Sequence, residues 1–360
     1  MKKILKYVAS ALALCLAVAM WGCGQSKPVL NVYMWSDYID LDLVKEFEQK
    51  YDCKVVIDIF DSNEFMYSKL KAGGSGYDII QPSSYMAKIM YEQKMIEKLD
   101  HSKLPSIKNV NKAYLDNLAI DKKMEYSVPY MIGFTCIAYN KDKLGKLPET
   151  WDVFANEKLK GRMTMLNDMR ETIGAALLFK GHSINTTDEK HLAEAKEQIL
   201  KWKKNLAKFD NEVYKVGIRS GEFQIVQGYS GDLFQVFEEA SELTWMCPKE
   251  GFSMCCDDWA IPVTAGNKEL AYKFIDFMTE PKNAAKNIEF TCFSAPVDGD
   301  QNIRIRILGE QNIWERHKVA AMEHLELINY IKNHDLPSAV ASIRVHLIHS
   351  KEAAFASFLN

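Results

Sequence analysis

The chain has 360 residues, of which 48% are hydrophobic and 26% are charged, and its formal net charge is -3 at pH 7. This length is sufficient for two lobes with separate cores, and the slightly acidic balance argues against a nucleic-acid-binding protein. After the first twenty or so residues, no stretch of sequence is apolar enough to span a membrane. A mildly acidic chain is compatible with small cationic partners.

The N-terminal residues have the pattern of an export signal. Three lysines stand within the first six residues, an apolar run follows from about 7 to 20, and Gly22 precedes Cys23. The run is too short for a bilayer and basic only at its front, so residues 1–22 are predicted to be a signal peptide. Cys23 resembles the lipidated cysteine of a bacterial lipobox, and residues 23–29 would then form a tether. The alternative is ordinary secretion with Cys23 as an incidental thiol.

Removal of residues 1–22 would leave 338 residues and, because three lysines and no acids are lost, a formal charge of -6. Besides Cys23, this mature chain has six cysteines without any CxxC pair, and its histidines include no HExxH. These spacings predict neither a zinc site nor a repeating disulfide framework. No metal and no cofactor are therefore expected.

The first part of the mature chain alternates between strand and helix patterns. Strands are predicted at 29–35, 53–60 and 77–82, and helices at 40–51 and 63–73. Short joints between alternating elements predict a largely parallel sheet that is covered by helices.

Two later stretches are predicted to cross between lobes. Residues 126–144 contain two apolar, aromatic-rich runs around Pro129 and Gly133, and residues 257–278 resemble a strand that passes through a proline joint into a helix. Between them, residues 150–166 and 191–209 build a second lobe. Two crossing strands form a hinge, and a hinged pair of α/β lobes binds its ligand between the lobes, at the carboxyl ends of the strands.

The loops that follow the predicted strands share acidic and aromatic side chains. The acidic residues are Asp37, Asp168, Glu171, Asp232 and Asp257, and the aromatic ones are Trp35, Tyr38, Tyr85 and Tyr229. Carboxylates that converge without a cation repel one another, whereas aromatic faces attract a cation and cover its methylenes. Several separated anionic points favour a linear cation that is charged at both ends, such as a diamine or polyamine.

Each of these residues also has a structural interpretation. Asp37 could cap the helix at 40–51, and Asp168 with Glu171 has the spacing of a capping box. Ser230 and Asp232 could cap the helix that follows them. Strand alternation places Asp257 and its neighbour Asp258 on opposite faces, which predicts that at least one of the two is an ordinary surface residue.

Seven stretches in order, between about Leu30 and Pro296, resemble the spermidine/putrescine-binding proteins of bacterial ABC importers. They are WSDYI, SGYDIIQPSSY, PYMIGFTCIAYN, TWDVFANEKLKGRM, YSGD, PKEG and DDWAIP. The resemblance implies that the polyamine cleft is lined by Trp35, Ser36, Asp37, Tyr38, Ser83, Tyr85, Asp168, Glu171, Tyr229, Asp232 and Asp257. Cys255 and Phe293 stand at two further wall positions where the family usually has a large aromatic residue and a tyrosine, and Tyr229 stands where it often has tryptophan.

The resemblance also implies a fold and a role. The fold is the two-lobed α/β periplasmic binding protein fold (type II), with lobe one formed by 30–130 plus about 260–310 and lobe two by 131–259 plus C-terminal helices. Such a protein hands a polyamine to a membrane permease that is driven by a cytoplasmic ATPase. We expect a periplasmic monomer that contacts the membrane only through a lipid anchor on Cys23.

Two other classes of function remain to be compared with this one. An enzyme would need a base near Cys255 or Cys256, and no histidine stands in the surrounding sequence, so catalysis is not expected. A binder of another small cation, thiamine or ferric ion, is the alternative within the binding class. The C-terminal stretch after Pro296 does not match the family and carries no assignment.

Overall fold

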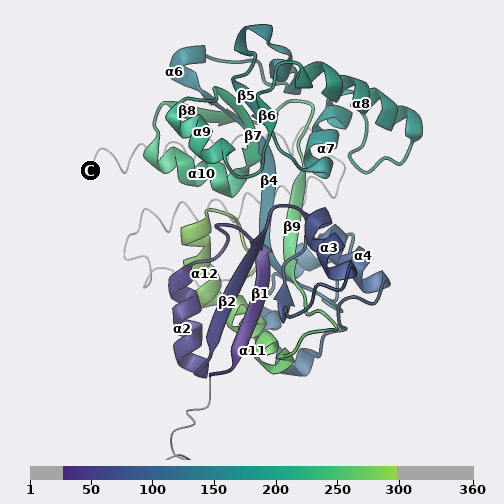
Figure 1. Ribbon diagram of the computed structural model, residues 1–360, viewed down its shortest axis with the longest axis vertical. Helices are drawn as coiled ribbons and strands as arrows, with labels where there is room; N and C mark the ends of the chain where they lie inside the picture. The colour runs from purple at the N-terminus through teal and green to yellow at the C-terminus, as the bar shows by residue number, and fades with distance from the viewer. Residues whose placement is uncertain (1–26, 298–360) are drawn as a thin grey trace, which may run out of the picture.

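The computed structural model describes residues 27–297, and Figure 1 shows them as two lobes joined by two strands. The predicted signal peptide, Cys23 and the C-terminal helices assigned to lobe two lie outside the described residues. The two-lobed α/β fold that the sequence predicts is confirmed.

The lower lobe in Figure 1 has a three-stranded parallel sheet in the order β2-β1-β3. Its strands are β1 (Val29–Trp35), β2 (Lys54–Phe60) and β3 (Ile79–Ile80). Its helices up to the first crossing are α2 (Leu41–Tyr51), α3 (Asn63–Lys71), α4 (Ser84–Glu92), η1 (His101–Lys103), η2 (Pro105–Asn109) and α5 (Lys112–Asn117). Strand β3 is shorter than the strand predicted at 77–82, because it pairs with β1 only at Ile79 and Ile80.

Helix α2 follows from its sequence pattern. Leu43, Val44 and Phe47 recur at helical spacing and are all buried. The side chain of Asp40 accepts a hydrogen bond from the backbone N–H of Asp42 at 2.8 Å, and so caps the helix. Asp37 is therefore not the cap of this helix.

The upper lobe is built on a second sheet in the order β6-β5-β7-β4-β8. Its strands, apart from β4, are β5 (Met163–Met165), β6 (Lys208–Phe209), β7 (Ile225–Tyr229) and β8 (Leu243–Met246). Its helices are α6 (Lys141–Leu144), η3 (Trp151–Ala155), η4 (Glu157–Leu159), α7 (Met169–Phe179), α8 (Glu189–Lys203), α9 (Tyr214–Ser220) and α10 (Ser230–Glu239). β5, β6 and β7 are parallel, whereas β4 enters from the other lobe and pairs antiparallel with β7 and β8.

Two antiparallel strands connect the lobes, as the sequence predicts. β4 (Val128–Asn140) runs upward from the lower lobe, and β9 (Met254–Trp259) returns beside it (Figure 1). The chain then enters α11 (Lys268–Thr279) and α12 (Pro281–Thr291) in the lower lobe. The paired register of β4 and β9 shifts just after Pro129, which has no N–H to give to the ladder.

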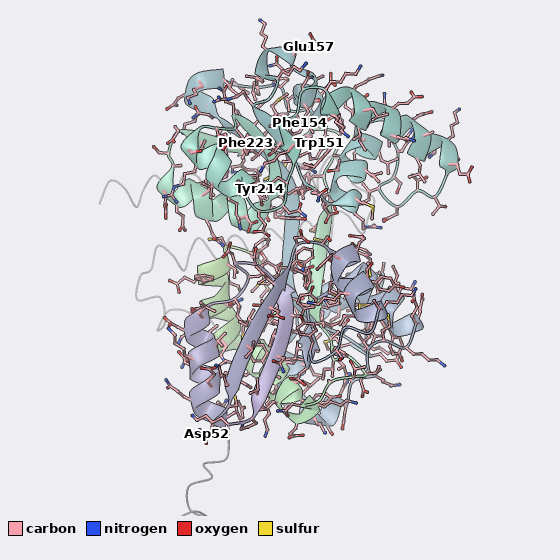
Figure 2. The ribbon with its side chains drawn as sticks, in the orientation of Figure 1. Asp52, Trp151, Phe154, Glu157, Tyr214 and Phe223 are labelled. Carbon is pink, nitrogen blue, oxygen red and sulfur yellow. The ribbon has the colours of Figure 1, made fainter. Side chains whose placement is uncertain are left out.

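Each lobe has its own buried core. In the upper lobe, Trp151, Phe154 and Trp202 are fully buried in one apolar cluster, and Figure 2 shows Trp151 and Phe154 inside that lobe. None of the six cysteines of residues 27–297 forms a disulfide. No helix within the described residues combines the length and hydrophobicity that crossing a membrane requires.

Candidate functional site

A cavity of about 300 Å³ lies between the two lobes, beside the crossing strands. Strands β1, β3, β5 and β7 all end in loops that contribute side chains to it, so it lies at the carboxyl ends of the strands. Twelve of the thirteen residues that the sequence assigns to the ligand line it. They are Trp35, Ser36, Tyr38, Ser83, Tyr85, Asp168, Glu171, Tyr229, Asp232, Cys255, Asp257 and Phe293.

Asp257, on the returning strand β9, is a buried carboxylate with a partner on each oxygen. Ser83 donates its hydroxyl to Oδ1 at 2.6 Å, and Tyr38 donates its hydroxyl to Oδ2 at 2.9 Å. Ser83 is in turn held by the amide of Asn63 at the start of α3. Burial raises the pKa of Asp257 to about 6, although both hydroxyls counteract the shift. A cation beside this carboxylate would remove much of the cost of ionising it.

Glu171 provides a second buried carboxylate from the other lobe. Its side chain accepts hydrogen bonds from Thr135 Oγ1 at 2.8 Å and from Ser253 Oγ at 2.9 Å, beside the crossing strands. Burial, and then the charge of Asp168, raise the pKa of Glu171 to about 7. Both buried acids thus bind protons more readily than usual when no ligand is present.

Asp168 caps helix α7 and also lines the cavity. One oxygen caps α7 by accepting from the N–H of Glu171 at 3.1 Å, and the other accepts from the hydroxyl of Tyr229 at 3.1 Å. The capping box is incomplete, because the Glu171 carboxylate turns to Thr135 and Ser253 instead of returning to the Asp168 backbone.

Asp232 is buried within the first turn of α10 and does not cap that helix. The hydroxyl of Tyr214 donates to its Oδ2 at 2.7 Å, and the same hydroxyl accepts from the N–H of Tyr229 at 3.3 Å. Figure 2 shows Tyr214 in the lower part of the upper lobe. Ser230 also makes no cap, since its hydroxyl accepts from the N–H of Phe134. The capping interpretation of this pair is therefore wrong.

The assignment of Asp37 to the cavity wall requires correction. Asp37 has a left-handed backbone conformation, with φ of 51°, and its side chain is 62% exposed. It is not among the residues that line the cavity. Its carboxylate binds Lys215 of α9 in the other lobe, with 2.8 Å between Oδ2 and Nζ. The turn after β1 thus directs Ser36 to the cavity and Asp37 to an ion pair.

The prediction that Asp257 or Asp258 lies at the surface is also wrong. Asp258 is 3% exposed, and its two oxygens accept from the hydroxyls of Ser84 and Ser127 at 2.9 and 2.8 Å. Burial raises its pKa to about 7. Ser84 begins α4 and Ser127 immediately precedes β4, so elements of the lower lobe enclose this carboxylate. Asp258 does not line the cavity.

Aromatic rings form the apolar walls of the cavity. Tyr38 and Phe293 meet edge to face, with 4.7 Å between ring centroids. The guanidinium of Arg170, in α7 of the upper lobe, lies 4.6 Å from the ring centroid of Tyr85, in α4 of the lower lobe. Trp35, which also lines the cavity, packs against the buried core of the lower lobe. Rings of this kind can cover the methylenes of an extended ligand.

The two unusual wall residues, Phe293 and Cys255, fit their surroundings. A Cβ on Gly231 would come within 2.1 Å of the Phe293 ring, and one on Gly133 within 2.9 Å, so the ring occupies the space that these two glycines leave. Burial, and next the charge of Asp257, raise the pKa of the Cys255 thiol well above its usual value. A thiol in this environment stays protonated and is a poor nucleophile.

Several lining residues were not assigned from the sequence: Asp61, Asn63, Arg170, Glu212 and Ser253. Asp61 and Asn63 stand just after the strand predicted at 53–60. Since residues that follow predicted strands are expected to line the cleft, both could have been assigned from the sequence. Glu212 follows β6, a strand of only two residues without a detectable periodic pattern. Among residues 27–297, no group of three His, Cys, Asp or Glu side chains could hold a metal ion.

Known proteins are similar to this chain over most of its length. The model of the bacterial extracellular solute-binding protein family matches residues 42–299. The putrescine/cadaverine-binding protein of Pseudomonas aeruginosa is 36% identical over 288 residues, which cover 76% of this chain and 81% of that protein.

Two solved structures are also similar. One, from Listeria monocytogenes and described as a spermidine/putrescine ABC transporter, has 32% identity and a TM-score of 0.72, covering 80% of this chain and 91% of that one. The other, a lipoprotein of Treponema pallidum, has 38% identity and a TM-score of 0.69, covering 74% and 84%.

Proposed function

Since the chain belongs to the bacterial extracellular solute-binding protein family, we propose that it is an extracytoplasmic receptor that captures a polyamine, putrescine or spermidine or both, between its two lobes. The observation that carries this proposal is the convergence of carboxylates from both lobes on one aromatic-walled cavity, with Asp257 and Glu171 buried. Asp257 comes from the returning strand beside the lower lobe, and Asp168 and Glu171 come from the upper lobe.

The geometry supports a mechanism of cation-driven closure. In the ligand-free cavity, burial raises the pKa values of Asp257 and Glu171, so part of the negative charge is neutralised by protons. An ammonium group favours the ionised carboxylates and displaces these protons. Since the two acids belong to different sides of the cleft, a diamine that contacts both stabilises the closed state over the open one.

The remaining residues would act on the apolar part of the ligand. Tyr38, Tyr85 and Phe293 offer ring faces and edges to the methylenes, and Tyr229 holds Asp168 in place through its hydroxyl. Of the predicted site, Asp37 is left out of direct ligand contact in this proposal because its carboxylate is engaged by Lys215.

The partners follow from the family. We expect the receptor to deliver its ligand to an ABC permease with a cytoplasmic ATPase, and to work as a monomer in the periplasm, anchored by a lipid on Cys23. Similar proteins are named as putrescine- or spermidine-binding, which supports a polyamine ligand over thiamine and ferric ion. One similar solved structure is that of a lipoprotein, which supports the lipid anchor.

Isothermal titration calorimetry tests the proposal. The mature chain with Cys23→Ser is unfolded and refolded to strip carried ligand, checked for folding by circular dichroism, and titrated with putrescine, spermidine and thiamine. We expect saturable one-to-one binding of at least one polyamine and none of thiamine. A folded protein that binds neither polyamine would overturn the proposal.

A further inference from the structure

One cation is already present in the acidic region between the lobes. The Nζ atom of Lys215 lies 2.8 Å from Asp37 Oδ2, 3.8 Å from Glu212 Oε2 and 3.9 Å from Asp232 Oδ2. Asp37 belongs to the lower lobe and the other two acids to the upper one. The side chain of Lys215 is 16% exposed, so its ammonium is largely withdrawn from water.

Two of these acids line the ligand cavity. Glu212 and Asp232 are lining residues, and Asp232 is buried with one hydrogen bond to its Oδ2 from Tyr214. Lys215 therefore contacts, from behind the wall, carboxylates that would otherwise be open to a ligand ammonium. Burial alone would lower the pKa of Lys215, but Asp232, Asp37 and Glu212 together raise it, which keeps the ammonium charged.

Neighbouring contacts hold this arrangement across the lobes. The hydroxyl of Ser36 donates to the carboxylate of Glu212, at 2.9 Å from each oxygen. The amide of Asn211 donates to the backbone carbonyl of Asp61 at 2.7 Å. Lys215 is thus fixed at one end of the cleft by the same contacts that join the lobes.

We propose that Lys215 is a specificity-determining residue whose ammonium occupies the place of a ligand cation beside Asp232 and so selects against ligands that carry a third ammonium group. This inference rests on the proposed polyamine-binding function. Four lining acids do not contact Lys215, and three of them, Asp168, Glu171 and Asp257, can pair with the two ends of a diamine. A third ammonium that reached towards Asp232 would face the like charge of Lys215, and like charges brought together cost several kcal/mol.

The test compares the ratio of two dissociation constants, spermidine over putrescine, in wild-type protein and Lys215→Met. Loss of the Asp37 ion pair weakens closure around either ligand, and the ratio removes this shared effect. We expect Lys215→Met to lower this ratio by about tenfold or more, in favour of spermidine, because the like-charge repulsion is gone. Lys215→Arg keeps the charge and should keep the ratio.

Two further variants complete the design. Lys196→Met removes one exposed charge from α8, away from the acidic cluster, and should leave the ratio unchanged. Lys215→Gln serves as a second neutral variant if the methionine variant unfolds, which circular dichroism would detect. An unchanged ratio in the folded neutral variants overturns the role of Lys215, whereas failure of wild-type protein to bind either amine overturns the proposed function itself.

Discussion

Replacement of Asp257 by asparagine tests whether its negative charge binds the ligand, without a large change in the fold. The substitution removes the charge and keeps the shape of a side chain that accepts hydrogen bonds from Ser83 and Tyr38. A charge-assisted hydrogen bond contributes about 1.5 to 3 kcal/mol, so polyamine affinity at pH 7 should fall by about 10- to 100-fold.

The same change should have a small effect on the stability of the ligand-free protein at pH 7. Burial raises the pKa of Asp257 from 3.8 to about 6, and a shift of about 2 units corresponds to about 3 kcal/mol of cost for the ionised form. Asparagine avoids this cost but makes poorer hydrogen bonds to Ser83 and Tyr38, which costs about 1 to 3 kcal/mol. The two contributions nearly cancel.

Both the stability of the folded protein and its affinity for a polyamine should depend on pH through Asp257. Because the folded-state pKa of Asp257 is raised, the folded protein holds the proton more tightly, and this contribution to stability is lost as pH rises from about 4 to about 6. At pH 5 only about a tenth of Asp257 is ionised in the ligand-free protein, so the affinity difference between wild type and Asp257→Asn should shrink about tenfold from its value at pH 7.

Calorimetric titration with putrescine and spermidine at pH 5 and pH 7, together with urea unfolding, measures these quantities. Asp258→Asn is the matched control, because Asp258 is the adjacent buried acid and does not line the cavity. It should leave the affinity close to wild type. An equal loss of affinity in both variants, or no loss in Asp257→Asn, would refute the assignment of Asp257 as a ligand carboxylate.

The other predictions concern proton release, closure and the core. Because burial and Asp168 raise the pKa of Glu171 to about 7, ligand binding at pH 7 should release protons, seen as a binding heat that varies with the ionisation enthalpy of the buffer, and Glu171→Gln should reduce this release. Gly231→Ala would place a Cβ within 2.1 Å of the Phe293 ring, so it should weaken polyamine binding and enlarge the radius of gyration measured by X-ray scattering at saturating ligand. Phe293→Ala in the same chain should restore the smaller radius of gyration, and a radius that stays enlarged would contradict the steric cause. Trp202→Ala, in the upper core, should lower the free energy of unfolding by about 3 to 5 kcal/mol in urea, and a loss below 1 kcal/mol would contradict its burial.

Several elements could be predicted from the sequence because their signals are local. Helix α2 shows its buried side through the spacing of Leu43, Val44 and Phe47, and β1 ends as expected before the turn that begins at Ser36. The alternation of strands and helices implies that the strand ends meet at one edge, which is why the acidic and aromatic loops were expected to meet in one cleft. Twelve of the thirteen assigned residues do line the cavity.

The partners of individual side chains were decided by the tertiary structure. Asp37 has the same local sequence signal as the lining residues, but its left-handed turn and the approach of Lys215, 178 positions away, draw it into an ion pair. Asp258 is buried in contact with Ser84 and Ser127, which are 174 and 131 positions away in the sequence. The sequence by itself determined which residues are acidic, aromatic and near a strand end, since periodicity and turn chemistry act between neighbours. Which of these carboxylates a ligand can reach depends on contacts between distant elements, and these exist only once both lobes have folded and met.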